Sequence, residues 1–462
     1  MTAPHAPSPP APARVALWLG LSWALAFAVV LGLARALGSH VEAGLALALF
    51  FVAQELGTLV LVVGAARRST PARLAAEAAR PAVSVLVAAL DETGSIVATL
   101  RSILAQHGVD FEVVVADDGS TDGTADLVTR TFGDRVRVLR LPHGGKGAAL
   151  ERARAVARHP VLVTVDADTE LAPGALAALA AAFVDPRVEA AAGAVVPRHP
   201  RGWLERFQVT EYLKNTLIRS GWSALGGLDQ VPGALAAIRA SSLAHAGGFP
   251  TDSITEDYEV AFRLYRAAAH EGRTILVPTI PEARAYTEPP RTLAGLVRQR
   301  TRWFAGFLST LFRFRDLVLQ PRTGAFGLAR LPLKVVDAVL PPIGLVSLVS
   351  LVLGIASGEA SISALSIGLL VLRAITDGVV HASAIALHRR ATPEGDAMEA
   401  PPLRWLIATA LLESWSYTWL KQLAVLRAYP FALARVRTWE SARDKPSPLE
   451  PRDAHEEAAP AE

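Results

Sequence analysis

The chain of 462 residues contains no cysteine. Disulfide bonds and thiolate metal sites are therefore excluded, which agrees with a cytoplasmic location for the folded domain. Net charge is also small, at +3. Because the arginines gather beside apolar segments instead of forming a basic surface of their own, the pattern does not indicate nucleic-acid binding.

Charged residues are scarce, at 19% against 51% hydrophobic residues. This composition is too apolar for an ordinary soluble protein and predicts an integral protein of the inner or plasma membrane. Residues 15–34 and 338–357 are each free of charge and long enough to cross a hydrocarbon layer of ~30 Å. We interpret the first as a span and not as a cleaved leader, because the apolar stretch 44–66 follows it at once.

Two later apolar stretches are interrupted by charge. In 362–387 an arginine and an aspartate lie four residues apart and can pair on one helical face turned away from lipid. In 404–429 a glutamate and a lysine interrupt the pattern, which leaves this segment open as a span. Two spans are thus expected within 14–66 and two or three within 335–429. Arginines after the second span place the next domain in the cytoplasm.

Between the membrane segments, residues 80–300 alternate between apolar strands and helical patterns. The expected elements are strand 83–90, helix 95–106, strand 111–117, helix 124–132, strand 136–140, helix 146–158 and strand 161–166. Strands buried on both faces and separated by helices predict an α/β domain with a mostly parallel sheet and flanking helices. Interface helices are expected at 301–330. The terminal segments 1–13 and 446–462 are expected to be disordered.

Acidic residues follow three of the predicted strands. They are Asp91 and Glu92, Asp117 and Asp118, and Asp166 and Asp168. Ligands bind beyond the carboxyl ends of parallel strands, where these side chains are expected to lie. The carboxylates therefore predict a cation-dependent phosphate site at one edge of the sheet.

The pattern Asp166-Ala167-Asp168 comes directly after a buried strand. One carboxylate could bind a metal ion on a sugar nucleotide while the other orients the donor. The turn 116–123 could accept hydrogen bonds from a uracil ring or a ribose, although a simple acidic turn explains it equally well. Lys146 opens a helix and could approach phosphate, or it could be a solvated lysine after a glycine turn. The glycine spacing of a P-loop is missing here.

The pattern Thr255-Glu256-Asp257 lies where a helix is expected to begin, about forty residues before a Gln-Arg-Thr-Arg-Trp cluster. Capping alone can explain acidic residues at a helix start, and tryptophan and arginine commonly anchor a protein at a membrane. Together, a carboxylate that could accept a proton, a ring that could stack on a sugar and arginines that could hold a diphosphate predict a sugar-transfer site. Its residues are Asp257, Gln299, Arg300, Arg302 and Trp303.

Seven pieces occur in order along the chain. They are VSVLVAALDE at 83–92, ADDGSTDGT at 116–124, GGKGAAL at 144–150, VDAD at 165–168, VPGALAAIR at 231–239, TED at 255–257 and QRTRW at 299–303. With this set the chain resembles the membrane-embedded family 2 glycosyltransferases, the group of cellulose, hyaluronan and poly-N-acetylglucosamine synthases. The resemblance covers residues 80–310. The last two pieces are specific to that group, whereas the earlier ones are shared with many other glycosyltransferases.

The resemblance implies a GT-A-like fold and a set of donor-binding residues, namely Glu92, Asp118, Lys146 and Asp166. In this set Asp118 would contact the uridine and Asp166 the diphosphate. Asp168 would hold a divalent ion, Mg2+ or Mn2+. The chain departs from the family pattern before Glu92, where Pro-x-Tyr-Asn-Glu is common and this chain has Ala-Ala-Leu-Asp-Glu. Without the tyrosine, a stacking contact on the base is lost.

The same resemblance makes Asp257 the general base and assigns the acceptor and the diphosphate to Gln299, Arg300, Arg302 and Trp303. It predicts inverting transfer from a nucleoside-diphosphate sugar, UDP-linked, onto a growing polysaccharide that is exported through the adjacent spans. Transfer of one sugar to a membrane lipid is an alternative, and a non-catalytic, nucleotide-sensing membrane scaffold is a second. The expected partners are a nucleotide-sugar donor, a carbohydrate or lipid acceptor and the membrane, with accessory subunits left open.

Overall fold

The computed structural model describes residues 63–64, 80–338, 356, 358, 360–392, 402–413 and 416–434. The predicted spans 15–34, 44–66 and 338–357 lie outside this part of the chain, apart from residues 63, 64, 338 and 356. The predicted disordered segments 1–13 and 446–462 lie outside it as well.

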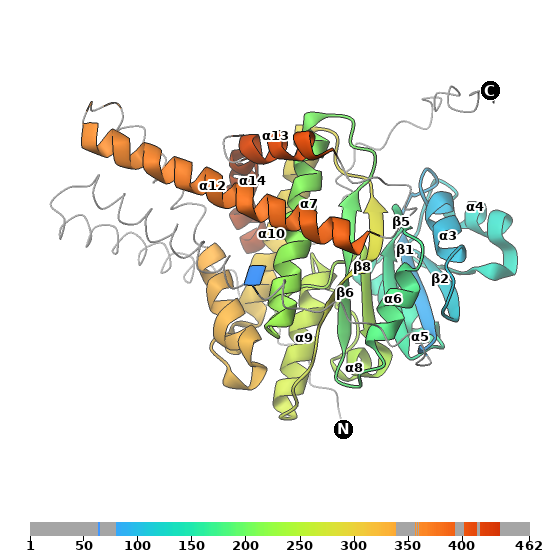
Figure 1. Cartoon of the computed structure of the whole chain (residues 1–462). Helices are drawn as coiled ribbons and strands as arrows, with labels where there is room; N and C mark the ends of the chain where they lie inside the picture. Colours follow the sequence, from blue (N-terminus) through green and yellow to red (C-terminus); the bar gives the residue numbers. More distant parts are fainter. Residues whose placement is uncertain are drawn as a thin grey trace, which may run out of the picture.

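Eight strands of the described residues form one sheet (Figure 1). They are β1 (Val83–Ala89), β2 (Phe111–Asp117), β3 (Arg137–Arg140), β4 (Val161–Asp166), β5 (Thr169–Leu171), β6 (Ala190–Pro197), β7 (Leu235–Arg239) and β8 (Thr279–Thr287). Their order across the sheet is β3-β2-β1-β4-β7-β6-β8-β5. The first four strands in chain order follow the sequence prediction to within one or two residues.

The prediction of a mostly parallel sheet holds for only one half of it. Strands β3, β2, β1 and β4 are parallel to one another. In the other half β6 and β8 are parallel, whereas β7 is antiparallel to both β4 and β6, and β5 is antiparallel to β8. Since β6 and β7 are antiparallel, the long connection between them returns the chain to the end of the sheet at which β6 finished. An apolar pattern predicts a strand but not its direction, so the mixed half could not be foreseen.

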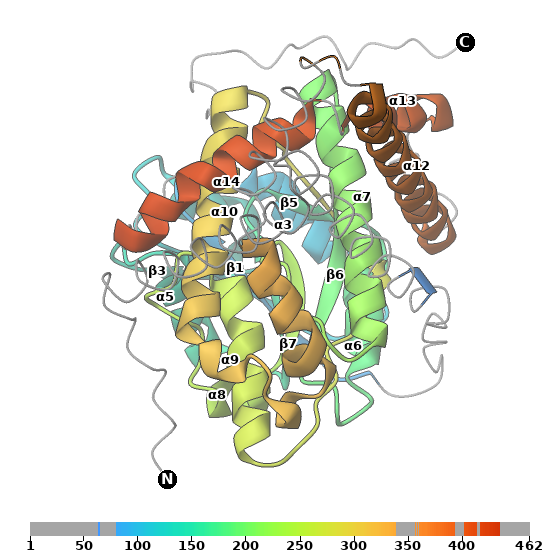
Figure 2. The same ribbon diagram turned by 90° about the vertical axis from the view of Figure 1, so that its left-hand side faces the viewer.

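Helices cover both faces of the sheet and extend away from it (Figures 1 and 2). They are α3 (Ile96–Leu104), α4 (Thr124–Phe132), α5 (Lys146–Val156), α6 (Ala175–Ala182), α7 (Trp203–Ala224), α8 (Ala240–His245), α9 (Glu256–His270), α10 (Leu293–Arg313), α12 (Ala360–Ala391), α13 (Leu403–Glu413) and α14 (Tyr417–Ala434). Short turns η1 (Gly133–Arg135), η2 (Arg315–Leu317), η3 (Pro321–Thr323) and the π-helical η4 (Phe326–Arg330) complete the set, and helix continues from η4 to residue 338.

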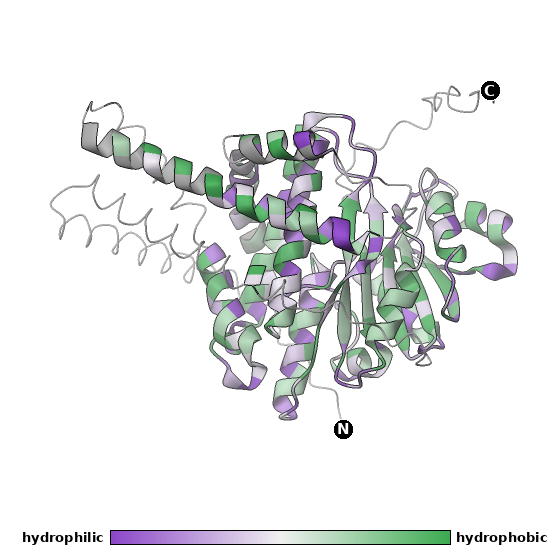
Figure 3. Cartoon of the chain, in the orientation of Figure 1, coloured by the Kyte–Doolittle hydropathy of each residue, from purple (hydrophilic) through white to green (hydrophobic). Residues whose placement is uncertain are grey.

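The strands are apolar on both faces, as a sheet covered by helices requires (Figure 3). In β1, Val85 belongs to the core beneath α3 and α6, and Leu86 belongs to the core on the opposite face beneath α5, α9 and α10. This alternation follows from the two-residue period of a strand. All of β1 is buried, and it lies between β2 and β4, the two strands that end in Asp117 and Asp166.

No helix in the described ranges combines the length and the apolarity that a membrane span needs. The stretch 362–387 lies within α12, which packs on α7. The stretch 404–429, left open as a span, is two helices: α13 contacts α7, and α14 lies along α10 (Figure 2). The expected boundary between a catalytic domain and interface helices at residue 300 falls inside α10, which is continuous.

Candidate active site

The acidic strand ends lie at one edge of the sheet, as the sequence predicts. In the parallel register, Ala89 at the end of β1 lies opposite Asp117 of β2, and the preceding Ala88 lies opposite Asp166 of β4. The edge therefore brings together carboxylates from separate parts of the sequence. This is the edge at which ligands bind in open α/β sheets.

Asp118 is buried, and its contacts stabilise the glycine loop that precedes α5. Its two carboxylate oxygens accept hydrogen bonds from the backbone N–H groups of Gly144 at 2.8 Å and Gly145 at 2.9 Å. The ring of His143 lies 2.9 Å from the same carboxylate. Asp118 thus positions the loop that begins α5, and the contact with uridine that the resemblance implies stays a prediction.

Glu92 lies beside the loop after β2. Its backbone N–H donates to the Thr124 hydroxyl at 2.8 Å, and its carboxylate accepts from the Ser95 hydroxyl at 2.7 Å. The neighbouring Asp91 has a φ of 52° and accepts from the Thr121 N–H at 2.7 Å. These bonds hold the acidic turn against the end of β1, so a donor-binding role for Glu92 would build on an already ordered loop.

Lys146 joins the D-x-D pattern to the Thr-Glu-Asp pattern. Its ammonium nitrogen lies 2.8 Å from Asp166 Oδ1 and 2.6 Å from Glu256 Oε1. Burial opposes the charge of Lys146, but the two carboxylates outweigh it and raise the pKa of the ammonium group above its usual range. The lysine is therefore a fixed cation at the carboxyl end of β4, and the solvated alternative considered from the sequence is wrong.

Gly233, in the loop before β7, lies directly against this bridge. A Cβ atom at this position would approach Lys146 Nζ to 2.7 Å and Glu256 Oε1 to 3.1 Å. Both distances are below ordinary contact separations for such atoms. Any side chain at residue 233 would displace the Lys146–Glu256 ion pair, so the close approach of the backbone requires glycine.

Asp168 is buried, and its Oδ1 accepts a hydrogen bond from the Thr169 hydroxyl at 3.1 Å. Within the described residues, no group of three or more histidine and acidic side chains is arranged to hold a metal ion. A site of this kind still fits Mg2+ or Mn2+, because such ions are commonly held by one or two carboxylates together with substrate phosphates. Asp166 and Asp168 supply those carboxylates. Together with Glu256 they carry three negative charges, of which Lys146 can balance only one.

Asp257 lies in the first turn of α9, after the N-cap residue Thr255. Gln230 donates from its side-chain amide to Asp257 Oδ2 at 2.9 Å, and the backbone N–H of Tyr258 donates to Oδ1 at 2.9 Å. Loss of water around this partly exposed carboxylate and the nearby charge of Glu256 raise the pKa of Asp257, against smaller opposing effects of the nearby lysine and Gln230. A raised pKa suits a general base.

The helix α10 contacts the Thr-Glu-Asp turn through a glycine. A Cβ at Gly306 would lie 2.1 Å from Thr255 Oγ1 and 2.8 Å from Thr255 Cβ, so the two backbones approach closely here. Gln299, Arg302, Trp303 and Gly306 follow the spacing of one helical face. The face of α10 that carries the Gln-x-x-Arg-Trp pattern is thus directed towards the turn that carries Asp257.

Arg300 lies off that face and points into a different cluster. Its guanidinium donates to Glu211 at 2.6 Å and to Tyr417 at 3.3 Å, and it packs over the Trp303 ring at 4.3 Å. Burial opposes its charge, but Glu211 outweighs it and raises the pKa of Arg300. This geometry favours a structural role for Arg300, which connects α10 to α7 and α14 and packs against one face of the Trp303 ring.

The remaining residues of the cluster are less constrained. Gln299 accepts a bond from Arg300 at 2.9 Å. Arg302 forms no hydrogen bond or ion pair with any residue that the structure describes, and its Nε is buried without a partner. Trp303 is partly buried, with its ring 6.4 Å from the ring of Tyr212 on α7. Arg302 and Trp303 therefore remain available for a ligand.

Four residues of this site were not foreseen from the sequence as site residues. They are Gln230, Gly233, Glu211 and Tyr212. The VPGALAAIR piece pointed to the segment that contains Gly233, but nothing in the sequence links Gln230 to Asp257 or Glu211 to Arg300. Those contacts join residues 27 and 89 positions apart in the chain, and only the tertiary fold brings them together.

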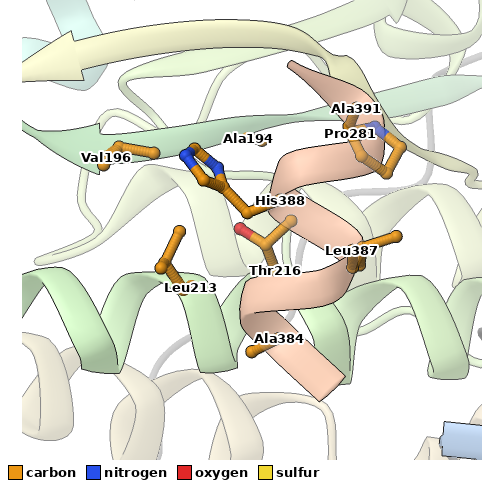
Figure 4. Close-up of a pocket in the computed structure, with 9 residues that line it drawn as sticks. All are labelled: Ala194, Val196, Leu213, Thr216, Pro281, Ala384, Leu387, His388 and Ala391. Atoms are coloured by element: carbon orange, nitrogen blue, oxygen red, sulfur yellow. The ribbon is translucent and has the colours of Figure 1, made fainter. Parts of the chain in front are cut away.

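A small cavity of about 10 Å³ lies elsewhere, between the sheet, α7 and α12 (Figure 4). Its lining residues are Ala194, Val196, Leu213, Thr216, Pro281, Ala384, Leu387, His388 and Ala391. It is mostly apolar and has no lining residue in common with the acidic edge. Its size is at the lower limit for one water molecule.

Residues 81–306, from the start of β1 into α10, match the family model described as "Glycosyltransferase like family 2". This part of the chain therefore belongs to glycosyltransferase family 2, and the resemblance inferred from its motifs is confirmed. The match includes the acidic strand ends, the Thr-Glu-Asp turn and the Gln-x-x-Arg-Trp face.

Two kinds of curated relative match. Poly-beta-1,6-N-acetyl-D-glucosamine synthase of Staphylococcus aureus (strain MSSA476) is 28% identical over 235 residues, which cover 50% of this chain and 56% of the relative. Beta-monoglucosyldiacylglycerol synthase of Nostoc sp. (strain PCC 7120 / SAG 25.82 / UTEX 2576) is 27% identical over 252 residues, which cover 53% of each. The chain thus spans about half the length of the curated relatives it matches.

Among solved structures, the mannosyltransferase PcManGT from Pyrobaculum calidifontis, in complex with GDP-Man and Mn2+, superposes with a TM-score of 0.53. The two proteins are 24% identical, and the superposition covers 75% of this chain and 98% of the other. At this identity the likeness shows the fold alone, which is GT-A-like, with a mixed sheet and flanking helices.

Proposed function

We propose that the chain is an inverting glycosyltransferase that moves a sugar from a nucleoside-diphosphate donor, a UDP-sugar, onto a hydroxyl acceptor. One observation carries this proposal: Asp257, a carboxylate with a raised pKa, lies between a bridge of Lys146 with two carboxylates and the Gln-x-x-Arg-Trp face of α10. A base placed between a phosphate-binding cation and an aromatic surface fits sugar transfer by single displacement.

The residues divide into a donor side and an acceptor side of Asp257. On the donor side, Lys146 and Asp166 position the diphosphate. On the acceptor side, Trp303 presents its ring to a sugar and Arg302 is free to donate hydrogen bonds. Asp257 takes the proton of the acceptor hydroxyl as its oxygen attacks the anomeric carbon. As this bond forms, the bond from the anomeric carbon to the donor diphosphate breaks, and Lys146, together with Arg302 reaching across from the acceptor side, stabilises the charge of the departing diphosphate.

Asp166 and Asp168 are the residues that would hold a divalent ion on the donor. That ion supplies charge neutralisation of the leaving diphosphate. The solved mannosyltransferase with GDP-Man and Mn2+ supports metal use by this fold.

Two acceptors remain in the proposal. The poly-N-acetylglucosamine synthase relative favours a growing polysaccharide, with export through membrane segments that flank the domain. The glucosyldiacylglycerol synthase relative favours transfer of one sugar to a membrane lipid. We place polymer synthesis first, because the chain carries the whole set of motifs through QRTRW, and we place the catalytic domain on the cytoplasmic side of the membrane.

A panel of radiolabelled nucleotide sugars, tested with membranes that contain the full chain, examines this proposal. We expect incorporation from one UDP-sugar into a product that separates as a ladder of sizes. A single product that partitions with lipid would favour the lipid acceptor. If no common sugar nucleotide is hydrolysed or transferred, the proposed activity is wrong.

A further inference from the structure

Arg219, on α7, has no hydrogen-bond or ion-pair partner among the residues that the structure describes. Its Nη1 is buried. Its burial lowers the pKa of its guanidinium, whereas nearby acidic groups raise it only partly. Two more deeply buried arginines are paired, Arg300 with Glu211 and Arg313 with Glu259. A buried donor without a partner is costly, so its retention needs an explanation.

The surroundings of Arg219 are those of the acceptor side. The groups that act on its charge are Tyr258, Tyr212, Asp257 and Asp229. Asp229 is already paired with Arg330 at 2.7 Å and Lys334 at 3.4 Å. Asp257 is therefore the carboxylate near Arg219 that has no cation of its own within bonding distance.

The geometry of α7 extends this surface. Tyr212 and Arg219 are seven residues apart, so they lie on one face of the helix. The ring of Tyr212 lies 6.4 Å from that of Trp303. Along this face of α7, Tyr212 lies beside Trp303, and Arg219 is close enough to Asp257 for their charges to interact. The groups around the donor side are different: Lys146 there faces Asp166 and Glu256.

We propose that Arg219 is an acceptor-binding residue, whose free N–H donates a hydrogen bond to an oxygen adjacent to the attacking hydroxyl of the acceptor. The ligand class is a vicinal hydroxyl or ester oxygen, which both the end of a glycan and the glycerol of a lipid provide. The Arg219 side chain is partly exposed while its Nη1 is covered, so the acceptor meets Nη1 when the guanidinium turns outward. This inference rests on the proposed glycosyltransferase activity and adds a residue that the sequence motifs do not contain.

The binding mode explains two features together. A bound acceptor oxygen satisfies the buried Nη1, and the charged guanidinium makes this a strong hydrogen bond that holds the acceptor in place. The donor-side groups Lys146, Asp166 and Glu256 contact one another, and none of them is among the groups that act most strongly on the charge of Arg219. Substitution of Arg219 should therefore change acceptor recognition and leave donor recognition intact.

The test measures separate Michaelis constants for donor and acceptor in Arg219→Met, Arg219→Lys and Arg206→Met. Arg206 is a matched control, since it lies on α7, is partly buried and stacks on Trp203 and Trp405 away from the site. The acceptors are an N-acetylglucosamine oligosaccharide and, in a second arm, diacylglycerol in phosphatidylcholine vesicles. Whichever arm supports turnover by the unmodified chain identifies the source of the acceptor oxygen.

For Arg219→Met we expect the acceptor KM to rise about tenfold or more, as loss of a charged donor predicts, with a donor KM within twofold. Arg219→Lys should recover part of the loss, and Arg206→Met should behave as the unmodified chain. An unchanged acceptor KM, or equal increases for donor and acceptor, would overturn the assignment. UDP affinity and thermal unfolding are measured for each variant to identify a folding defect. If Arg219→Met fails to fold, the acceptor and donor KM values of Arg219→Lys provide the test. Absence of turnover by the unmodified chain would instead refute the proposed function.

Discussion

Substitution of Gly306 by alanine tests whether close contact between α10 and the Thr-Glu-Asp turn is needed for activity. The new Cβ would lie 2.1 Å from Thr255 Oγ1, 2.5 Å from Cγ2 and 2.8 Å from Cβ. Rotation of the threonine side chain can move the first two atoms but not its Cβ. Since carbon atoms pack at ~3.5–4.0 Å, the two backbones must separate by about 1 Å.

The expected effects on stability and on activity differ in size. Overpacking costs about 1–3 kcal/mol, and the better helix propensity of alanine offsets up to ~1 kcal/mol of it. The free energy of unfolding should therefore fall by about 0–2 kcal/mol. Activity should fall much further, by about 100-fold, because a displacement of about 1 Å misaligns Asp257 and the face that carries Trp303.

The assay compares kcat/KM for sugar transfer with thermal unfolding of the same variants. Gly378→Ala is the control, since Gly378 also lies in a helix and a Cβ there meets nothing within 4 Å. A second variant, Gly306→Ala with Thr255→Gly, removes all three clashing atoms and should restore part of the activity, as a double-mutant cycle would detect. Normal activity of Gly306→Ala would refute the geometric link between the two motifs.

Three further substitutions or treatments have defined outcomes. Gln230→Met removes the amide donor that favours ionised Asp257, so the pKa of Asp257, already raised in the native site, should rise further. The acid limb of the kcat/KM profile should then move to higher pH, and an unchanged midpoint would contradict this. Lys146→Met leaves Asp166 and Glu256 without their cation and should lower kcat/KM about 100-fold, whereas Arg152→Met, exposed on the same helix, should have no effect. Chelation of divalent ions should abolish transfer reversibly, and Asp168→Asn should weaken activation by Mn2+; full activity after chelation would exclude the metal.

The sequence predicted the parallel half of the sheet well because strong local signals define it. Apolar runs such as 83–90 and 161–166, rich in valine and separated by helical patterns, favour buried parallel strands, and carboxylates that follow such strands gather at one edge of the sheet. The direction of β7, in contrast, depends on where α7 and the following loop return the chain. No local sequence pattern indicates where the chain returns, so the antiparallel pairing of β7 with β4 and β6 was not predicted.

The candidate site shows the same division. Asp166, Asp257 and Trp303 could be found because each belongs to a motif whose spacing has a chemical meaning. Arg300 belongs to the same motif as Trp303, but the helical period places it on another face of α10, where it contacts Glu211. Position on a helical face, rather than membership of the motif, decides which arginine is available to a ligand.

Asp257→Asn separates nucleotide-sugar binding from sugar transfer. The amide keeps the size of the side chain but cannot accept the proton of the acceptor hydroxyl. We expect transfer to be lost while the affinity for the nucleotide sugar, measured by calorimetry, stays within about twofold, a difference of ~0.4 kcal/mol. Full transfer activity in this variant would contradict the assignment of Asp257 as the base.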